Sequence, residues 1–246
     1  MRLHLLASWL FVSCIATLPA IAQTNWQPDQ YRATYAAKYN GMPVEATREL
    51  KKTNQGYRLV SSVKGLLGHV TEQEEFHLGS EGRIHPDRYT SEKAFLGIES
   101  SEQMVVDNKA NKAVYTRKKK VRELAVSAHY LGPVSYQVQL ARDLQVSAPS
   151  LSYQIMSRGK IRDYHFEILG EENLTIPIGV IRVLKLQRVR DAGEQRQTVF
   201  WMAPDWGFLI VKIYQQEEDG ANYELILKTA KINGKPVSPT SEPRSL

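Results

Sequence analysis

Apolar and polar residues alternate with a period of two along most of the chain from Tyr31 onward. In the first such stretch, one side of the chain carries Tyr31, Ala33, Tyr35, Ala37 and Tyr39. Asn40-Gly41 follows directly, and this pair favours the positive φ angles of a tight hairpin turn. The pattern therefore predicts a half-buried β-strand that reverses into a second strand over Val44–Lys51.

The same alternation continues to the end of the chain. Further strands are expected near 57–63, 69–78, 88–95, 102–106, 113–117, 121–126, 163–168, 209–214 and 223–228. Turn residues such as Asn54-Gln55-Gly56, Asp107-Asn108, Asp191-Ala192-Gly193 and Asp219-Gly220 separate the strands. Many strands joined by short turns predict a mostly β fold. We expect a long antiparallel meander that forms a curved sheet or an open or half barrel.

One segment breaks the period of two. Between Pro133 and Ser147 the apolar residues recur at helical spacing. Pro133 suits the first turn of a helix, where backbone N–H groups have no intrahelical acceptor. We expect one helix near 133–147, packed against the sheet. The stretch 27–235 then forms a single β-rich domain, and the Pro- and Ser-rich tail 236–246 is expected to be disordered.

The first 22 residues have the pattern of a secretory signal. Arg2 precedes an apolar run from Leu5 to Leu18, and Ala20-Ile21-Ala22 matches the small-x-small site of a signal peptidase. We expect export to the periplasm with cleavage after Ala22. An uncleaved anchor is one alternative, although the run is short beside the roughly 20 residues of a spanning helix. Lipidation at Cys14 is another, although the neighbouring residues fit such a site poorly.

Cysteine content and charge add two constraints. Cys14 is the only cysteine, so the mature chain would hold no disulfide and would depend on its core. The net charge is +6, and part of the excess lies in Arg117–Lys120. Lys118, Lys119 and Lys120 are a candidate surface for anionic lipid head groups or lipopolysaccharide. The alternative, which we favour, is a solvated lysine-rich turn or strand that protects a sheet edge.

Two classes of protein are not expected. Export argues against nucleic acid as a partner. No other segment approaches the length of a membrane span, so an integral membrane protein is not expected either.

The residue patterns of common enzymes and metal sites are missing from the sequence. It has no cysteine nucleophile after cleavage, no G-x-S-x-G, no Gly-rich phosphate loop and no H-E-x-x-H. His69, Glu75 and His77 share one face of a predicted strand, with Glu72 and Glu74 on the other face. The two histidines lie roughly 26 Å apart at about 3.3 Å per residue, too far to share one ion. We expect no catalytic residue, no metal and no cofactor.

Aromatic residues supply the candidate ligand contacts. Rings with a polar tip suit the wall of a β cavity that is dry at one end and wet at the other. The candidate wall residues are Tyr35, Tyr57, Phe166, Trp201 and Trp206. For any single ring, ordinary core packing is the stronger interpretation. A cavity becomes plausible because one helix alone would cover only part of a long curved sheet.

Three stretches together resemble a known family of exported proteobacterial proteins, the domain of unknown function 3108. They are YAAKYNGMPVEATREL with GYRLVSSVKGLLG, then EENLTIPIGVIRVLKLQRVR, and finally TVFWMAPDWGFLIVKI. The most specific part joins Thr175, Pro177 and Gly179 to the downstream Ala203-Pro204-Asp205. The resemblance covers about 31–231 and implies an exported, β-rich chain with a curved sheet or half-barrel and no agreed catalytic residues. Ile210 stands where the family pattern often has a proline. This departure from the pattern affects the expected strand edge at that position and not the resemblance as a whole.

Three functions are compatible with this sequence. The one we favour is a periplasmic, non-enzymatic binding or carrier module that holds a lipid or another apolar envelope ligand against a concave β surface. The second is a structural or assembly factor of the cell envelope that contacts another protein through a sheet edge. The third is a hydrolase of envelope polymers, which would need two carboxylates about 5–10 Å apart.

Overall fold

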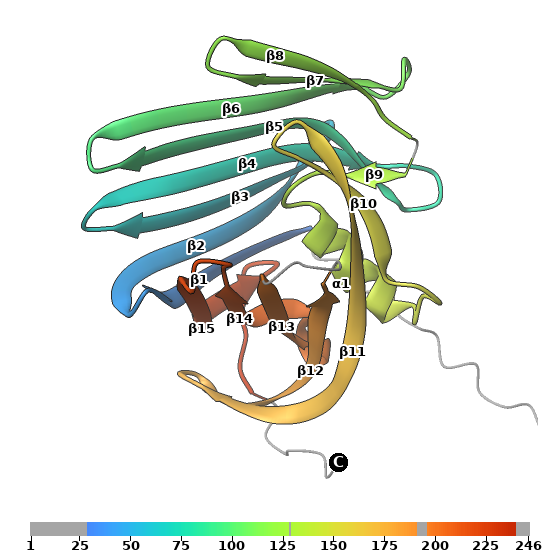
Figure 1. Ribbon diagram of the computed structural model, residues 1–246. Helices are drawn as coiled ribbons and strands as arrows, with labels where there is room; N and C mark the ends of the chain where they lie inside the picture. The colour runs from blue at the N-terminus through green and yellow to red at the C-terminus, as the bar shows by residue number, and fades with distance from the viewer. Residues whose placement is uncertain (1–28, 128, 191–195, 240–246) are drawn as a thin grey trace, which may run out of the picture.

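The computed structural model describes residues 29–127, 129–190 and 196–239. The first half of this part is a meander of antiparallel strands. Its members are β1 (Gln30–Tyr39), β2 (Met42–Thr53), β3 (Gly56–Gly65), β4 (Gly68–Leu78), β5 (Ile84–Phe95), β6 (Ile98–Asp107), β7 (Lys112–Arg117) and β8 (Lys120–Ala125). Consecutive strands pair with each other throughout, as the turn residues predict (Figure 1).

The second half contains the helix and the remaining strands. Its elements are β9 (Tyr130–Leu131), α1 (Tyr136–Gln145), β10 (Ser152–Ser157), β11 (Lys160–Ile176), β12 (Gly179–Val189), β13 (Gln197–Ala203), the short 3-10 helix η1 (Pro204–Trp206), β14 (Leu209–Gln216), β15 (Asn222–Ile232) and β16 (Lys235–Pro236). From β10 to β15 the neighbours are again antiparallel, whereas β9 pairs with β10 in parallel. The longest strand, β11, curves around the lower end of the molecule in Figure 1.

Pairing between β1 and β15 joins the two halves into one sheet. Tyr31 lies opposite Ile232, and Tyr39 lies opposite Tyr223. The sheet path runs from β8 through β1 and β15 to β9, so β8 and β9 are its ends and the described sheet is not closed. The predicted fold, a mostly β antiparallel meander in an open curved sheet with one helix, is confirmed.

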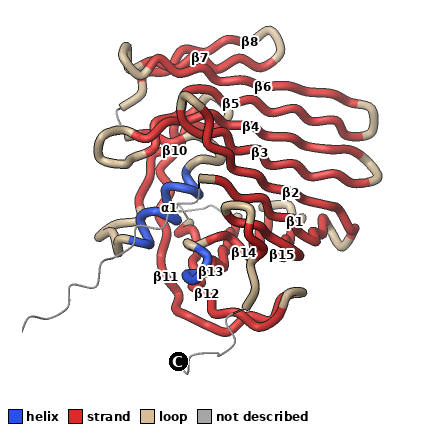
Figure 2. The backbone as a smooth tube through the Cα atoms, turned by 180° about the vertical axis from the view of Figure 1, so that it is seen from behind, coloured by secondary structure: helices blue, strands red, loops and turns tan. Residues whose placement is uncertain are grey.

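The sheet curls so that its two halves face each other, and α1 lies between them (Figures 1 and 2). One cluster of buried side chains surrounds α1 and includes Leu59, Phe76, Tyr89, Met104 and Phe200. A second cluster lies against β1 and β12–β15 and includes Ala33, Leu227, Val211, Val183 and Trp201. Because β13 carries buried residues on both faces, it contributes to both clusters.

Helix α1 is shorter than the sequence predicts. It begins at Tyr136 after Ser135, and Pro133 lies in the preceding turn. The prediction of Pro133 in the first helical turn is therefore wrong. The physical reason is a carboxylate from β4, Glu74, which accepts hydrogen bonds from the N–H groups of Val134 and Ser135 and holds both residues in a turn. The helix ends at Gln145, two residues before the predicted end.

Several predicted segments lie outside the described residues or only partly within them. The leader 1–22 with Cys14 and the turn Asp191-Ala192-Gly193 are outside. The first residues of the predicted tail lie against β15, where β16 pairs and Val237 N–H donates to the carbonyl of Ala230. Across the described residues, none of the helices has the length and apolar composition to cross a membrane.

Candidate binding site

The N-terminal end of α1 is fixed to β4 by Glu74. This side chain is fully buried. Its carboxylate accepts hydrogen bonds from the N–H of Val134 at 3.0 Å, the N–H of Ser135 at 2.9 Å and the hydroxyl of Ser135. These donors belong to the first turn around a helix N-terminus, where backbone N–H groups lack other acceptors. Glu74 therefore sets the position of the helix over the sheet.

Burial raises the pKa of Glu74 to about 7, although the three hydrogen bonds act in the opposite direction by favouring the charged carboxylate. The ordinary value for this group is near 4.5. Near neutral pH the carboxyl group is thus divided between its two protonation states, and the strength of the contact with α1 depends on pH.

Arg48 on β2 holds the other side of the same turn. Its guanidinium donates to the hydroxyl of Tyr31 at 2.9 Å, to the carbonyl of Val134 at 3.3 Å and to the side-chain carbonyl of Gln137. The side chain is only 9 % exposed. Burial of a charge is costly unless it is hydrogen-bonded, and these three acceptors satisfy that requirement. Arg48 thus joins β1, β2 and α1 at one point.

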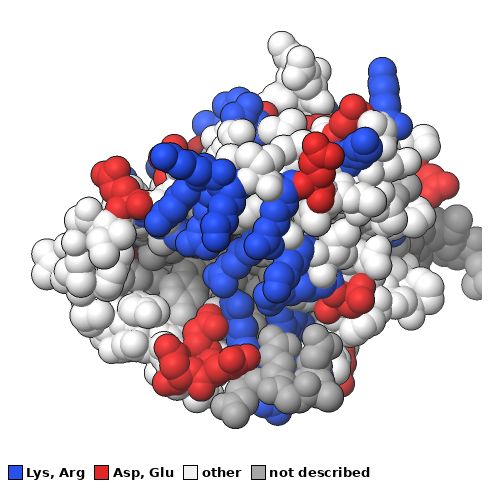
Figure 3. Space-filling view, turned by 45° about the horizontal axis from the view of Figure 1, so that its top comes forward, with Lys and Arg blue, Asp and Glu red and all other residues white. Residues whose placement is uncertain are grey.

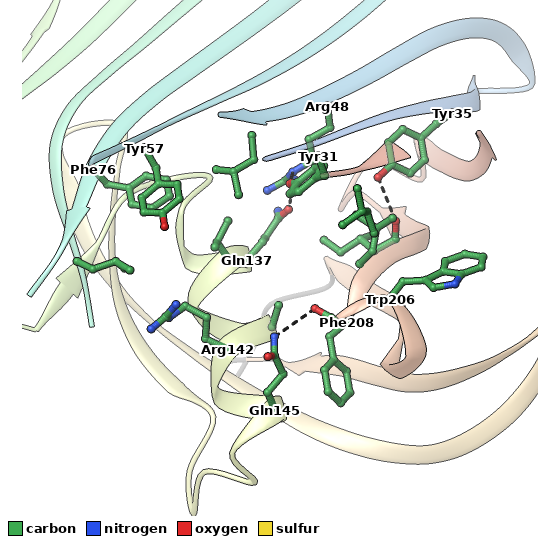
Figure 4. A pocket seen from close by; sticks show the side chains of 18 residues that line it. Tyr31, Tyr35, Arg48, Tyr57, Phe76, Gln137, Arg142, Gln145, Trp206 and Phe208 are labelled. Atoms are coloured by element: carbon green, nitrogen blue, oxygen red, sulfur yellow. Dashed lines mark hydrogen bonds between the residues drawn. The ribbon is translucent and has the colours of Figure 1, made fainter. Parts of the chain in front are cut away.

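Two cavities lie on either side of this point. We call the first the apolar cavity. It has a volume of about 60 Å³ and lies between α1, β1–β4 and the segment 206–210. Figure 4 shows Tyr57, Phe76, Trp206 and Phe208 around it, with Arg142 and Gln145 on the side of the helix. Its wall is mostly hydrocarbon, so it favours an apolar group.

We call the second the polar cavity. It has a volume of about 230 Å³ and is bounded by β1–β4, β11–β15 and the start of α1. Its wall includes the side chains of Arg48, Arg188 and Arg196, several tyrosines, and the hydroxyl groups of Ser61, Ser62 and Thr198. Glu72 is the one carboxylate among the described residues of this wall. The two cavities share four wall residues, Tyr35, Arg48, Gln137 and Ile210.

The arginines of the polar cavity are held in place by neighbours. The guanidinium of Arg188 lies over the ring of Tyr164, with 4.5 Å between its central carbon and the ring centroid. Arg196 forms an ion pair with Glu217 at 3.5 Å. Glu72 accepts a hydrogen bond from the hydroxyl of Tyr89 at 2.7 Å. The wall carries three guanidinium groups and one carboxylate, and Glu217 from outside the wall pairs with one of the three. Guanidinium geometry suits carboxylate or phosphate groups.

Three of the five candidate wall residues line the apolar cavity. They are Tyr35, Tyr57 and Trp206. Tyr35 also lines the polar cavity, and its hydroxyl donates to the carbonyl of Ile210 at 3.0 Å (Figure 4). Tyr57 stacks on Phe76 with 5.6 Å between ring centroids. The structure thus brings together residues from β1, β3 and η1 that lie far apart in the sequence.

The other two candidates lie elsewhere. Phe166 packs in the core among Tyr136, Tyr153 and Phe200, and it does not line either cavity. Trp201 lies on the face of β13 opposite to Phe200, because successive residues of a strand point to opposite faces. Its indole N–H donates to Glu172 at 2.6 Å, and the amino groups of Lys185 and Lys212 lie about 5 Å from the ring centroid.

Lys118, Lys119 and Lys120 are far from both cavities. Lys118 and Lys119 form the two-residue turn between β7 and β8, and Lys120 starts β8 at the end of the sheet. All three side chains are exposed. This position agrees with both interpretations of the lysines, as protection of a sheet edge and as a surface for anionic groups.

The sequence did not indicate Arg48, Arg188 and Arg196 as site residues. The signal available for Arg48 was its place on the apolar side of a strand, between Ala46 and Leu50. Its partners at Val134 and Gln137 are separated from it by 86 and 89 residues, and no local pattern links them. Among the described residues, no group of three or more His, Cys, Asp or Glu side chains is placed to hold a metal ion.

Solved structures with a similar fold are distant in sequence. A β-barrel-like protein of the domain of unknown function DUF1849 from Brucella abortus has a TM-score of 0.56 at 10% identity, covering 84% of this chain and 99% of that chain. A protein described as exported, from Bacteroides fragilis, has a TM-score of 0.33 at 12% identity, covering 83% and 96%. A domain described as lipoprotein-sorting, from Vibrio parahaemolyticus, has a TM-score of 0.24 at 11% identity, covering 82% and 85%.

The first of these structures shows the fold, and the last two are only remotely similar. A search of curated proteins gives no significant match. The family model for proteins of unknown function DUF3108 matches residues 30–227, most of the described chain, and confirms the resemblance. The chain therefore belongs to the DUF3108 family of proteins of unknown function.

Proposed function

We propose that the protein is an exported, non-enzymatic binding module for an anionic amphiphile. The anionic group occupies the polar cavity beside Arg48, Arg188 and Arg196, and the apolar part extends toward the apolar cavity. One observation carries this proposal: the two cavities meet at Tyr35, Arg48, Gln137 and Ile210, so a cationic wall and a hydrocarbon wall are adjacent. The leader predicted at 1–22 supports a place in the periplasm.

The size of the cavities supports a small ligand. A cavity of about 150 Å³ holds one benzene molecule, and pockets that enclose drug-sized ligands have about 300–1,000 Å³. The polar cavity, at about 230 Å³, fits one head group or a short chain. The apolar cavity, at about 60 Å³, takes only a few carbon atoms, so the rest of a longer chain would lie outside the two cavities. A single-chain amphiphile with a carboxylate or phosphate group matches these volumes better than an intact two-chain lipid. Each CH₂ group that leaves water contributes about 0.8 kcal/mol, so a short chain suffices for useful affinity.

The chemistry of the walls supports binding rather than catalysis. The described residues that line the two cavities include no histidine, cysteine or lysine, and Glu72 is their only carboxylate. Hydrolysis of glycosidic bonds by two carboxylates therefore has no candidate pair in these cavities. The hydroxyl groups of Ser61 and Ser62 have no histidine among the wall residues to act as a general base.

An assembly factor that binds through a sheet edge has weaker support. β8 is an end of the described sheet, and its outward edge is the place where another strand would add. The strand carries Lys120, Arg122 and Glu123, all exposed. Charged side chains at an edge discourage strand addition. The edge therefore favours protection over protein contact.

Calorimetric titration with dodecanoate tests the proposal, with dodecyltrimethylammonium as the matched chain of opposite charge. We expect dodecanoate to bind at one site and the cationic amphiphile to bind at least about tenfold more weakly. Arg188→Gln should weaken dodecanoate binding by about tenfold, because a hydrogen bond to a charged group contributes about 1.5–3 kcal/mol. Arg182→Gln is the control, since Arg182 lies on the same strand but pairs outside the cavities with Glu171 and Asp205. Equal affinities of the two amphiphiles would contradict the proposal.

A further inference from the structure

Large apolar side chains are exposed at two neighbouring hairpin turns of the first half of the sheet. The turn between β3 and β4 carries Leu66, which is 100% exposed, and Leu67. The turn between β5 and β6 is flanked by Phe95 and Ile98 and contains Leu96, which is 65% exposed. Both turns lie at the left of Figure 1, where the strands β3–β6 end.

These residues form one cluster, which we call the tip cluster: Leu66, Leu67, Phe95, Leu96 and Ile98. The N–H of Leu96 donates to the carbonyl of Leu67 at 2.9 Å, so the two turns are joined directly. Soluble proteins expose single apolar residues often, but contiguous exposed apolar patches mark surfaces that meet a partner or a membrane. The tip cluster is such a patch, and it projects beyond the rest of its strands.

The backbone of the β5–β6 turn gives a second reason to assign a role to Leu96. Leu96 and Gly97 have φ angles of 48° and 79°. Asn40-Gly41 and Asn233-Gly234 adopt nearly the same pairs of angles, 47° and 78°, and 49° and 80°. Asparagine is favoured in this type of turn, whereas leucine at positive φ is strained. Lys118 and Arg158 also have positive φ in two-residue turns, so asparagine is not obligatory there. A leucine that is 65% exposed, however, buries little surface to offset the strain.

Basic residues lie directly behind the tip cluster. A polar pocket of about 190 Å³ at the same end of the strands is lined by Lys93, Arg117 and Arg158, with Glu102 and three serines. Lys93 lies two residues before Phe95, and Arg117 pairs in register with Glu102, four residues after Ile98. At about 3.3 Å per residue, the cations are set back by about 7 to 13 Å from the apolar tips. The lysine turn 118–119 lies beside them.

Basic and acidic side chains are unevenly distributed around this end of the molecule. Figure 3 shows Lys and Arg side chains gathered beside an uncharged bulge at the left of the molecule. Glu99 is the acidic residue next to Ile98. The acidic turn with Glu217, Glu218 and Asp219 lies at the other side of β1, where β15 begins opposite Tyr39. An anionic surface would thus attract the β5–β8 side and repel the β14–β15 side.

We propose that the tip cluster docks the protein on the surface of an anionic phospholipid bilayer. Apolar groups of peripheral proteins enter about 5–10 Å into the boundary between head groups and acyl chains. With the tips at that depth, Lys93, Arg117 and Arg158 lie at the level of the phosphate groups, and the pocket that they line accepts one head-group phosphate. Lys118 and Lys119 then face the head groups from the side.

A second copy of this chain is a poorer match to the surface. In a symmetric dimer the same patch meets itself, so the basic residues around the tips would face each other. Like charges that meet across an interface are unfavourable. An anionic bilayer matches both the apolar tips and the charge behind them. The docking surface lies outside both cavities, so this proposal is independent of the proposed function and its variants leave the cavity walls intact.

Sedimentation with vesicles tests the proposal, with the full chain expressed from its own leader and purified without detergent. The vesicles contain phosphatidylcholine alone or phosphatidylcholine with one third phosphatidylglycerol. We expect the protein to bind the anionic vesicles at least about tenfold more tightly, because each basic residue near an anionic surface contributes several-fold. The variant Leu66→Ser/Leu96→Asn/Ile98→Thr should lose this binding at least tenfold. Lys93→Gln/Arg158→Asn should bind both vesicles about equally weakly.

The variants are chosen to fold. Leu96→Asn and Arg158→Asn place a favoured residue at positive φ, and Ile98→Thr keeps a β-branched residue in a strand. Ile168→Thr/Leu169→Ser/Val180→Thr is the matched control, because it removes exposed apolar groups from β11 and β12 and should bind like the wild type. Three results would overturn the proposal: wild-type protein that stays in solution with both vesicles, tip variants that bind as tightly as the wild type, or a dimer in light scattering that the tip variant abolishes while vesicles bind neither form.

Discussion

The carboxylate of Glu74 on β4 accepts two backbone hydrogen bonds from Val134 and Ser135, 60 and 61 residues further along the chain. This contact seats the only helix of more than one turn among the described residues. It also carries a titratable group into the core. Loss of the carboxylate would leave two N–H groups and one hydroxyl group without their acceptor.

Replacement of Glu74 by alanine should lower the free energy of unfolding by about 3 kcal/mol at pH 6. Each buried polar group that loses its partner costs about 1–3 kcal/mol, and relaxation of the turn would recover part of the sum. Urea denaturation followed by circular dichroism measures the change. Glu75→Ala, on the exposed face of the same strand, is the control and should cost less than about 1 kcal/mol. Equal costs for the two variants would contradict the role of Glu74.

Glu74 should also make stability depend on pH. Its folded pKa of about 7 lies above the ordinary 4.5, so the folded state binds the proton more tightly than the unfolded state. The contribution to stability is therefore complete below pH 4.5 and is lost as pH rises to about 7. The difference in unfolding free energy between wild type and Glu74→Gln should shift by up to about 3 kcal/mol across this range. A difference that stays constant with pH would contradict the assignment.

Arg48 should be as important to the position of α1 as Glu74. Arg48→Met removes the donors to Val134 and Gln137 but keeps most of the volume, and we expect a loss of about 2–3 kcal/mol because three acceptors lose their donor. Amide hydrogen exchange should increase first in 134–140, near the start of α1. Arg32→Met on β1 is exposed and serves as the control. Unchanged exchange in α1 would show that the guanidinium does not hold the helix.

Two tryptophans should respond differently to the ligand. Trp206 of η1 lines the apolar cavity, whereas Trp201 of β13 lines neither cavity. Trp206→Ala should weaken dodecanoate binding by roughly tenfold or more, since a large apolar contact is worth about 1.5–3 kcal/mol. Trp201→Phe should leave affinity unchanged. Calorimetric titration of both variants with dodecanoate, at equal concentrations of folded protein, measures the two affinities. Equal losses of affinity would contradict the assignment of Trp206, but not Trp201, to the cavity wall.

Exchanging leucine and asparagine at positions 96 and 40 tests whether leucine is strained at positive φ. Leu96→Asn should raise the free energy of unfolding by about 0.5–1 kcal/mol, because a leucine at positive φ costs about 1 kcal/mol relative to a favoured residue. Asn40→Leu should lower it by a similar amount, since that turn has nearly the same angles. Thermal unfolding of the two variants measures both effects. A stabilising effect of leucine at either site would contradict the strain.

The strand pattern could be predicted because one face of each strand is buried. The buried positions of β1 are Ala33, Tyr35 and Ala37, as the alternation of its residues indicates. Turn residues such as Asn40-Gly41 are equally local, since their φ angles depend on two residues only. The alternation did not indicate β9, β10, β12 or β13. Of these, β9 and β10 are short, and the parallel pairing between them depends on the chain that loops over α1.

The candidate site was only partly predictable, because its residues lie far apart in the sequence. The aromatic residues Tyr35, Tyr57 and Trp206 could be chosen by type, but their shared cavity depends on the pairing of β1 with β15. A period of two assigns Trp201 and Phe200 to opposite faces but does not tell which of these faces the cavity. Arg48 and Glu74 needed partners at 134–137, and such long-range hydrogen bonds have no local sequence pattern.

Native mass spectrometry tests the central claim, that the cavities hold an anionic amphiphile. The full sequence is expressed with the leader predicted at 1–22, purified from the periplasmic fraction without detergent, and extracted with organic solvent in parallel. The account predicts a stoichiometric adduct that extracts into solvent, carries a carboxylate or phosphate group, and is reduced in Arg188→Gln but not in Arg182→Gln. A clean mass of the protein alone across several preparations, together with no binding of dodecanoate in solution, would contradict it.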